Sequence, residues 1–458
     1  MKLLFRTAFF LFIFILASCK KDKKVTTPPT ITYNAPSTGQ AYGYVYDAIA
    51  HKYHLPINVI ARVTDAVRLS SVNVSLTDMN HTPLQGPVSV PIISADFNFN
   101  IIYDVTDFRL QTGTYLIQIT ADDGTSASSS FQPIYVIEAP TLWLGYCYNL
   151  KGNPQLITGI DSLKNGNLSI PLTGTYNGMK YGSYNQQLYV NGNGNMPFTA
   201  YNIQNGASVY QVTATPGQIN YTSLNTDGYK PYIGFRNGNL YAYSNTGAEN
   251  TSYRYTGANP SYPYYFATTS TNNVAVYTNI AASPPNNDVL VTFSSAGAAY
   301  NSTNLSVYSS LSKIIGVFEK SLDSLYVLGN DTNNQAIAYV YTSEGGFSTS
   351  PISGFGSFGK MLSATKINNE SVVFSTNNGV YVCNGLHVNM TSLLPSAQKI
   401  IYQSKLNVLV AANSTANAGT LSAYTLSATS GIFSLTPIAK MSLTLADSVF
   451  DFELITNK

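Results

Sequence analysis

The stretch Ser448-Val449-Phe450-Asp451-Phe452-Glu453-Leu454-Ile455 is typical of a β-strand, because its carboxylates alternate with phenylalanines, and only three residues follow it. Its partners are therefore expected at the start of the same domain, in residues 142–149, 155–161 and 168–172. Pairing with these three segments closes a ring of sheets and removes two exposed edges. An array of β-sandwiches is the competing fold, but it offers no reason for a lone last strand.

Six segments between these ends share one pattern. Each has an apolar strand, a polar turn and a second strand of the Leu-Tyr-Val kind, and most continue into further strands. They lie around Lys180, Tyr229, Tyr264, Lys313, Lys360 and Lys399. Units of four strands at spacings of about 32 to 50 residues are typical of propeller blades. Residues 140–458 are therefore predicted to form a seven-bladed β-propeller closed by pairing of its N-terminal and C-terminal strands.

Residues 31–138 show shorter alternating runs, such as 57–63, 72–76 and 115–119, separated by Asn, Asp, Gly and Pro. About seven strands in some hundred residues predict an Ig-like β-sandwich. Tyr115 follows a turn glycine at the start of a strand, which resembles a tyrosine corner. The whole chain is thus expected to be all-β, with a sandwich followed by a propeller.

The N-terminus has the features of a secretory signal. Lys2 and Arg6 precede an apolar run that ends at Leu16, and the run is too short and wrongly flanked for a membrane-spanning helix. The ending Leu16-Ala17-Ser18-Cys19 resembles the lipobox of bacterial lipoproteins. That resemblance implies a signal peptide over residues 1–18 and lipid attachment at Cys19, on a flexible tether of residues 19–30. An ordinary signal peptide with an incidental cysteine is the alternative.

Composition narrows the classes of function. Charged residues make up 10% of the 458 residues, so the polar surface must be mostly uncharged. Beyond residue 25 the chain has 18 basic and 21 acidic side chains, because the first 25 residues hold six of the 24 Lys and Arg and one of the 22 Asp and Glu. No basic cluster remains there, which excludes nucleic acid as a partner. Cys147 and Cys383 lie in separate apolar strands and are expected to be buried free thiols.

The sequence contains no recognisable catalytic or metal-binding constellation, and no cofactor is expected. There is no HExxH motif and no glycine-rich phosphate loop. Asp451 and Glu453 are the carboxylates that need a closer look, because they fall on one side of the last strand. They are expected to line a wet central channel, with Glu319 similarly placed. Acid and base work by this pair is the alternative.

The sequence offers more candidate residues for ligand binding than for catalysis. The loops expected between blades carry aromatic side chains, and the loops between second and third strands carry amides. The predicted ligand-binding residues are Tyr176, Tyr181, Tyr229, Tyr262, Tyr264, Phe355 and Phe358, and the amides are Asn193, Asn195, Asn286, Asn287, Asn333 and Asn334. Aromatic rings beside uncharged donors and acceptors suit a sugar. Because the chain is rich in Tyr and Asn throughout, its composition alone explains equally well why these loops carry aromatic and amide side chains.

The lipobox followed by a sandwich and a propeller resembles Bacteroidota outer-membrane lipoproteins, many of which are associated with glycan uptake. The resemblance implies a non-catalytic binding or scaffold protein, anchored in the outer membrane through its N-terminal lipid, with a glycan or an outer-membrane protein as partner. The cell surface and the periplasmic face both remain open as locations. The alternatives are a polysaccharide-degrading enzyme on the propeller, and a structural or adhesion partner of a membrane protein complex.

Overall fold

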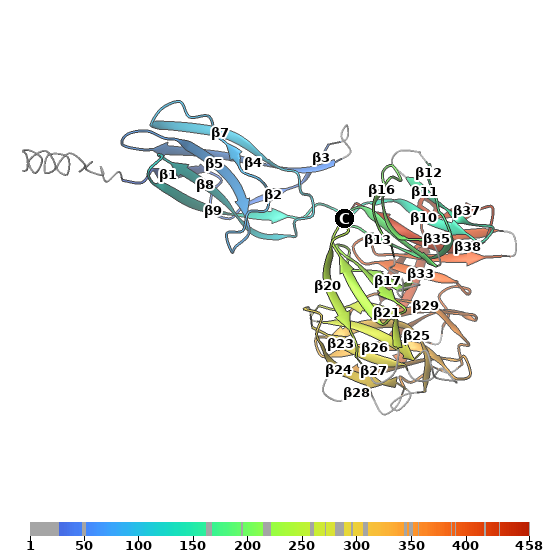
Figure 1. The fold of residues 1–458 in the computed structure, drawn as a ribbon. Helices are drawn as coiled ribbons and strands as arrows, with labels where there is room; N and C mark the ends of the chain where they lie inside the picture. Colours follow the sequence, from blue (N-terminus) through green and yellow to red (C-terminus); the bar gives the residue numbers. More distant parts are fainter. Residues whose placement is uncertain are drawn as a thin grey trace, which may run out of the picture. The chain divides into compact units, whose positions relative to one another are not determined.

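The computed structural model describes residues 27–457 with several internal gaps. The gaps are 48–51, 162–166, 194–195, 214–220, 257–260, 271, 280–287, 295, 306–309, 343–345, 348–350, 356, 386, 390, 416–417 and 430. The signal peptide and Cys19 therefore lie outside the described residues. Contacts within the chain divide it into two compact units, Met1–Pro140 and Thr141–Lys458. The division falls close to the boundary predicted between residues 138 and 140, and Figure 1 draws both units.

Unit 1 consists of two sheets that share one core. The strands of the first sheet are β1 (Thr30–Ala35), β3 (Val45–Asp47), β4 (Lys52–Thr64) and β7 (Asp96–Val105). Those of the second are β2 (Gln40–Gly43), β5 (Ser71–Thr77), β6 (Val88–Ser89), β8 (Gly113–Asp122) and β9 (Ala127–Ile137). Alternate residues of β4, such as Ile57 and Val59, point inward and meet Val74 and Ile119 of the other sheet. The Tyr115 hydroxyl donates to the Gln111 carbonyl at 3.0 Å, which is the hydrogen bond expected of a tyrosine corner.

Unit 2 is built from antiparallel sheets, and the described residues form seven of them. Sheet 1 contains β38 (Val449–Thr456), β10 (Trp143–Leu150), β11 (Asn153–Asp161) and β12 (Asn167–Pro171). Sheet 2 contains β13 (Thr175–Gly182), β14 (Gln187–Asn193), β15 (Phe198–Asn202) and β16 (Ser208–Val212), and sheet 3 contains β17 (Tyr221–Thr226), β18 (Pro231–Phe235), β19 (Asn239–Tyr243) and β20 (Glu249–Arg254).

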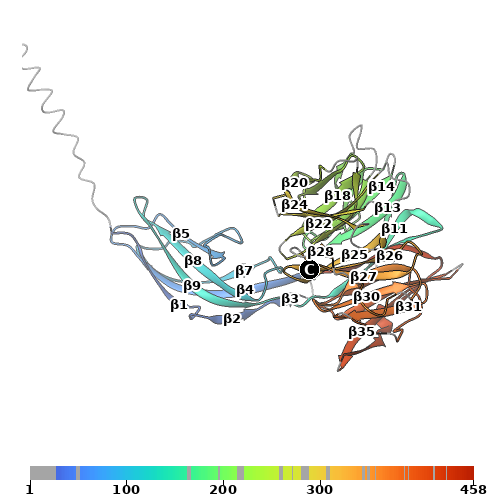
Figure 2. The same cartoon turned by 90° about the horizontal axis from the view of Figure 1, so that it is seen from below.

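The other four sheets follow in chain order (Figures 1 and 2). Sheet 4 contains β21 (Ser261–Thr268), β22 (Asn273–Asn279), β23 (Val289–Phe293) and β24 (Ala299–Asn304), and sheet 5 contains β25 (Leu311–Ser321), β26 (Ser324–Asp331), β27 (Ala336–Thr342) and β28 (Gly346–Phe347). Sheet 6 contains β29 (Met361–Lys366), β30 (Ser371–Thr376), β31 (Gly379–Asn384) and β32 (His387–Val388). Sheet 7 contains β33 (Lys399–Gln403), β34 (Val408–Ser414), β35 (Gly419–Thr429), β36 (Ile432–Pro437) and β37 (Leu443–Leu445), and the short 3-10 helix η1 (Ala439–Met441) precedes β37.

Each sheet of unit 2 packs on two neighbours, and this explains the apolar second strands. In β26, Leu325 and Val327 face the core shared with sheet 4, while Tyr326 and Leu328 face the core shared with sheet 6. Both faces of such a strand are buried, so its sequence is a continuous apolar run. Seven hydrophobic clusters lie between consecutive sheets in this way, and one of them joins sheet 7 to sheet 1. The architecture is therefore all-β and of the propeller type.

The last strand pairs where the sequence analysis placed it. Strand β38 is antiparallel to β10 from the pair Trp143 and Thr456 to the pair Leu150 and Val449. The red strand β38 accordingly lies beside β10 in Figure 1. The Asn457 side chain accepts a hydrogen bond from the Leu142 amide at 2.7 Å and extends this pairing by one residue. The first strands also contact one another in order from β13 through β17, β21, β25, β29 and β33 to β38, and β38 contacts β13.

The two cysteines of unit 2 are free and buried, as predicted. Burial raises the pKa of both thiols, that of Cys383 to about 12, so they remain protonated at neutral pH. Within the described ranges, no helix has the length and apolar character needed to cross a membrane.

We expect removal of residues 447–458 to collapse the soluble yield. The deletion exposes one edge of β10 and takes Val449, Phe452 and Leu454 out of the core between sheets 7 and 1. Expression yield and thermal unfolding measure the effect, and a chain lacking only Lys458 is the control. A truncated chain that unfolds at the temperature of the intact chain would contradict the role assigned to β38.

Candidate functional site

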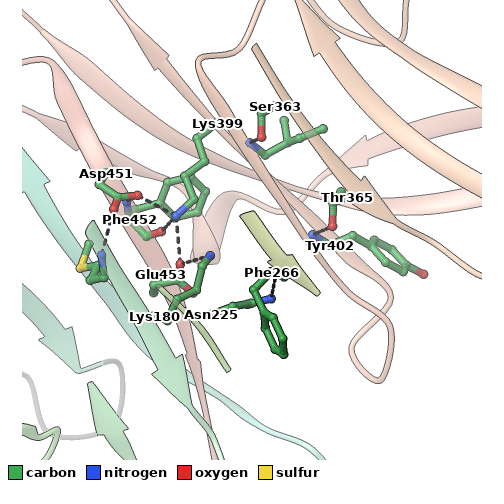
Figure 3. A network of polar contacts seen from close by, with 12 residues as sticks. Lys180, Asn225, Phe266, Ser363, Thr365, Lys399, Tyr402, Asp451, Phe452 and Glu453 are labelled. Carbon is green, nitrogen blue, oxygen red and sulfur yellow. Dashed lines mark hydrogen bonds and ion pairs between the residues drawn. The ribbon is translucent and has the colours of Figure 1, made fainter. Parts of the chain in front are cut away.

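A group of charged side chains lies where the first strands of sheets 1, 2 and 7 meet. We call it the closure cluster and define it by Tyr176, Lys180, Lys399, Asp451 and Glu453. Figure 3 labels the two lysines and the two carboxylates. Asp451 and Glu453 are two apart in β38, and this spacing puts both carboxylates on one side of the strand. The lysines come from the flanking strands β33 and β13, so the cluster joins both neighbours to the last strand.

Lys399 is the centre of the closure cluster. Its Nζ lies 2.6 Å from Asp451 Oδ1 and 2.9 Å from Glu453 Oε1. The same ammonium donates to the carbonyl of Phe452 at 2.5 Å and lies 5.2 Å from the centre of the Phe452 ring. An ammonium has three N–H donors, and here each of them has an oxygen acceptor. The lysine side chain is thereby fixed against the backbone and both carboxylates of β38.

The contacts from sheet 2 complete the cluster. Lys180 Nζ lies 3.0 Å from Glu453 Oε1, and the Tyr176 hydroxyl donates to Asp451 Oδ2 at 2.6 Å. The amide of Met179 also donates to Asp451 Oδ2, at 3.3 Å. Both oxygens of Asp451 are therefore hydrogen-bonded, one by sheet 7 and the other by sheet 2. The side chains of Asp451 and Glu453 retain 16% and 10% of their exposure, so the cluster is largely shielded from solvent.

The pKa values follow from these contacts. Burial alone would raise the pKa of Asp451, but the Lys399 ammonium and the Tyr176 hydroxyl hold it below its ordinary value. Burial alone would lower the pKa of Lys399, but Asp451 and Glu453 raise it instead. Burial and the neighbouring Asp451 raise the pKa of Tyr176 well above its ordinary value. At neutral pH Asp451 is thus a carboxylate, Lys399 is an ammonium group and Tyr176 is a neutral phenol.

Other first strands are joined by single side chains. The Ile400 and Tyr402 amides of β33 donate to Ser363 Oγ and Thr365 Oγ1 of β29 at 3.1 and 3.2 Å, and the Asn225 side chain donates to the Phe266 carbonyl (Figure 3). Neighbouring first strands form no ladder, so side chains satisfy these backbone groups instead. Glu319 takes part in a similar junction, because it accepts from Ser270 and lies 4.0 Å from Lys366 Nζ.

The structure corrects the predicted loop position of four aromatic residues and the predicted exposure of two others. Tyr176 and Tyr181 lie within β13, and Tyr262 and Tyr264 lie within β21, so these four are strand residues and not loop residues. Phe355 and Phe358 do lie in a connection between sheets, but they pack into the core of sheets 5 and 6. The Phe355 ring stacks on Phe374 at 4.8 Å, and Phe358 is 3% exposed.

The reason is that the phenol group lets tyrosine fill a core while its hydroxyl reaches a polar partner. The Tyr181 hydroxyl donates to the Thr456 carbonyl at 2.6 Å, across the junction of sheets 2 and 1. The Tyr264 hydroxyl donates to Asp288 Oδ2 at 2.5 Å. Tyr176 and Tyr181 are 6% and 8% exposed, and neither presents a ring face to solvent.

Tyr229 is an exposed member of the predicted set, and it lies at the end of the sheets opposite to Phe355 and Phe358. The prediction took the segment at Tyr229 as a first strand, but β17 already begins at Tyr221 and Tyr229 follows it. Turns after first and third strands share one end of an antiparallel sheet, and turns after second and fourth strands share the other. Tyr229 belongs to the first end, and Phe355 and Phe358 belong to the second. The structure therefore does not bring the seven residues together.

The structure describes only part of the predicted amide set, and Asn193 is the last residue of β14. Asn333 and Asn334 lie in the turn between β26 and β27, whereas Asn195, Asn286 and Asn287 lie outside the described residues. Sequence reasoning missed Tyr184, which stacks on Tyr229, although its place beside Asn185 in a polar turn is a signal of exposure.

Among the described residues no group of three or more His, Cys, Asp and Glu is arranged to hold a metal ion.

We expect Lys399→Met to destabilise the protein by about 3 kcal/mol at pH 7, because it leaves paired carboxylates without their main cation. The folded-state pKa of Asp451 lies below the unfolded value of about 3.9, so its contribution to wild-type stability is present above that pH and is lost as the pH falls through the folded-state pKa. The folded-state pKa of Lys399 is raised, so its contribution is present below pH about 10.4 and is lost at higher pH. Wild-type stability should therefore be nearly constant between pH 5 and pH 9 as far as these two groups determine it.

The stability of Lys399→Met should depend on pH in a different way, because two close carboxylates that have lost a neighbouring cation favour protonation. Thermal unfolding of Lys399→Met should occur at a higher temperature at pH 5 than at pH 7. Lys440→Met removes an exposed lysine of η1 and is the matched control, with an expected change within about 0.5 kcal/mol. A Lys399→Met protein as stable as this control at pH 7 would contradict the role of the closure cluster.

No family model and no curated protein matches the chain. Among solved structures it is similar to BamB from Moraxella catarrhalis, with a TM-score of 0.40 and 12% identity over 66% of this chain and 96% of that chain. It is also similar to a putative 6-phosphogluconolactonase from Bacteroides fragilis, with a TM-score of 0.45 and 11% identity over 68% of this chain and 98% of that chain. A third is the computationally designed Ika8 protein, with a TM-score of 0.41 and 10% identity over 66% of this chain and 96% of that chain. Similarities at this level carry no information about activity or partners.

Proposed function

We propose that this protein is a lipid-anchored, non-catalytic binding or scaffold protein of the bacterial outer membrane. The anchor rests on the sequence Leu16-Ala17-Ser18-Cys19 and on the resemblance to Bacteroidota lipoproteins. The partner is a glycan of a nutrient-uptake system or a protein of the same membrane. Surface and periplasmic locations are both compatible with this proposal.

The closure cluster is the observation that carries the non-catalytic part. A carboxyl pair that cleaves glycosidic bonds needs one member with a raised pKa, so that it can donate a proton at neutral pH. Asp451 has a lowered pKa, and both it and Glu453 are ion-paired with Lys399. These ion pairs support a role for the two carboxylates in joining strands, in place of a role as an acid and a base.

The finer architecture belongs to the same proposal. We infer that the seven sheets are the blades of a closed seven-bladed β-propeller, supported by the cyclic order of the cores and by the contact of β38 with β13. We infer that unit 1 is an Ig-like β-sandwich, supported by its two sheets around one core and by the Tyr115 corner. A closed ring presents rigid turns at both ends, which suits binding.

A polysaccharide-degrading enzyme is the second candidate, and Asp288 is the residue that favours it. Burial raises the pKa of this carboxyl, which is 6% exposed and accepts a hydrogen bond from Tyr264. A carboxyl with a raised pKa is the kind of group that could donate a proton to a leaving group. Release of reducing ends from polysaccharides, abolished by Asp288→Asn, would establish this function in place of the first.

We expect Cys19→Ala to release the protein from the membrane. Several acyl chains anchor a protein stably, whereas the apolar run alone would be removed with the signal peptide. The measurement is the share of protein that sediments with outer membranes after a high-salt wash. Cys383→Ala makes the same change at a buried thiol and should leave the sedimenting share unaltered. Cys19→Ala protein that still sediments with the membranes would rule out the lipid anchor.

A further inference from the structure

Two tyrosines from different sheets form a stacked pair at one end of unit 2. Tyr184 lies in the turn between β13 and β14, and Tyr229 lies in the turn between β17 and β18. Their ring centres are 3.6 Å apart and the ring planes differ by 12°. Both turns follow the first strand of their sheet, so they occur at the same end. We call this pair the tyrosine platform.

The backbone under Tyr229 is held by hydrogen bonds on every side. Asp227 Oδ1 accepts from the Tyr229 and Lys230 amides at 2.8 and 2.7 Å, and Asp227 Oδ2 accepts from the Tyr232 hydroxyl at 2.9 Å. The Tyr229 carbonyl accepts from the Asn185 side chain, and the Gly228 carbonyl accepts from the Tyr184 amide at 3.1 Å. The two turns are therefore fixed to each other.

Gly228 shows how closely the rings fit this backbone. Its φ of +94° is one that other residues rarely adopt, and a Cβ placed on it would lie 2.9 Å from the Tyr184 ring. The Tyr184 ring thus lies between the glycine and the Tyr229 ring. Tyr229, on the outside, remains 48% exposed. An aromatic ring that is fixed but half exposed has already lost the freedom that a ligand would otherwise have to restrict.

Uncharged hydrogen-bonding groups continue from the platform along the same end of sheet 2. Asn185 and Gln186 follow Tyr184 in its turn, and Gln204 of the next turn at this end donates to Gln186 Oε1 at 3.2 Å. Gln204 is exposed, and Asn185 and Gln186 are partly exposed. The Asn185 side chain donates to the Tyr229 carbonyl and the Tyr189 hydroxyl, and the Gln186 side chain donates to the Asn457 carbonyl. The site therefore has one apolar ring face beside amides, and the amide groups that these contacts do not use can donate or accept hydrogen bonds.

This combination fits a sugar better than it fits a protein. A stable protein interface buries about 800 Å² on each partner around a core of several apolar side chains, whereas the platform offers a single ring. A sugar ring needs one aromatic face for its C–H groups and donors and acceptors for its hydroxyls, and the platform with its amides supplies both. We propose that the tyrosine platform is a carbohydrate-binding site, with Tyr229 as the stacking residue; this rests on the binding function proposed above.

The experiment is affinity electrophoresis of the detergent-solubilised full-length chain in native gels. Each gel contains soluble starch, xylan, pectic galactan, laminarin or dextran, and a gel without polysaccharide gives the reference mobility. We expect retardation in at least one of the five gels. Tyr229→Ala should raise the dissociation constant for that polysaccharide more than fivefold, because truncating an aromatic anchor removes a large share of the binding energy. Tyr229→Phe keeps the ring and should stay within twofold of wild type.

Tyr135→Ala is the matched control, because it removes a tyrosine that is 42% exposed on β9 of unit 1. It should bind as wild type does. Retardation in none of the gels, equal binding by Tyr229→Ala, or a loss in Tyr229→Phe as large as in Tyr229→Ala would overturn the site. Thermal unfolding of each variant shows whether it is folded. Failure of these tests alongside membrane release by Cys19→Ala would overturn the carbohydrate site and leave the anchored scaffold function in place.

Discussion

The antiparallel pairing of β38 with β10 is the constraint on which unit 2 depends. It joins residues about 300 positions apart in the chain, so the loss of chain entropy on folding must be repaid by contacts that form only when the pairing is complete. Strand β38 supplies those contacts on both faces. Phe452 and Leu454 enter the core between sheets 7 and 1, while Ile455 enters the core between sheets 1 and 2. Without β38, each of these two cores would be incomplete.

The closure cluster favours one register of the pairing between β38 and β10. A shift of β38 by one residue would turn Asp451 and Glu453 away from Lys399 and Lys180, and would place Phe450 and Phe452 toward the two ammonium groups. Ion pairs that are partly shielded from water contribute little net stability, but breaking one leaves an uncompensated charge. In a chain with only 10% charged residues, four charges gathered at the last strand act mainly against the wrong register.

Sequence patterns predicted the fold further than they predicted the site. The lone last strand and its three partners could be recognised because an unpaired strand edge is unfavourable. The order of segments along the chain is enough to show that the last strand lacks neighbouring partners. The first strand of sheet 3 was missed because β17, with the sequence Tyr-Thr-Ser-Leu-Asn-Thr, is more polar than β18, which is buried throughout. The aromatic site was misplaced for a different reason. The Tyr181 hydroxyl has its acceptor in another sheet, at the Thr456 carbonyl, and no local pattern reveals that acceptor.

The turn between β13 and β14 connects the end of the chain to the tyrosine platform. The Gln186 side chain donates to the Asn457 carbonyl at 3.1 Å, directly after β38. In the same turn, the Asn185 side chain donates to the Tyr229 carbonyl and the Tyr184 amide donates to the Gly228 carbonyl. Opening of the β38 pairing would therefore release this turn at one side and loosen the fixed ring at the other. A ring whose position depends on closure binds only when unit 2 is completely folded. The pairing of the last strand thus adds to the rigidity that the Asp227 hydrogen bonds give to the turn of Tyr229.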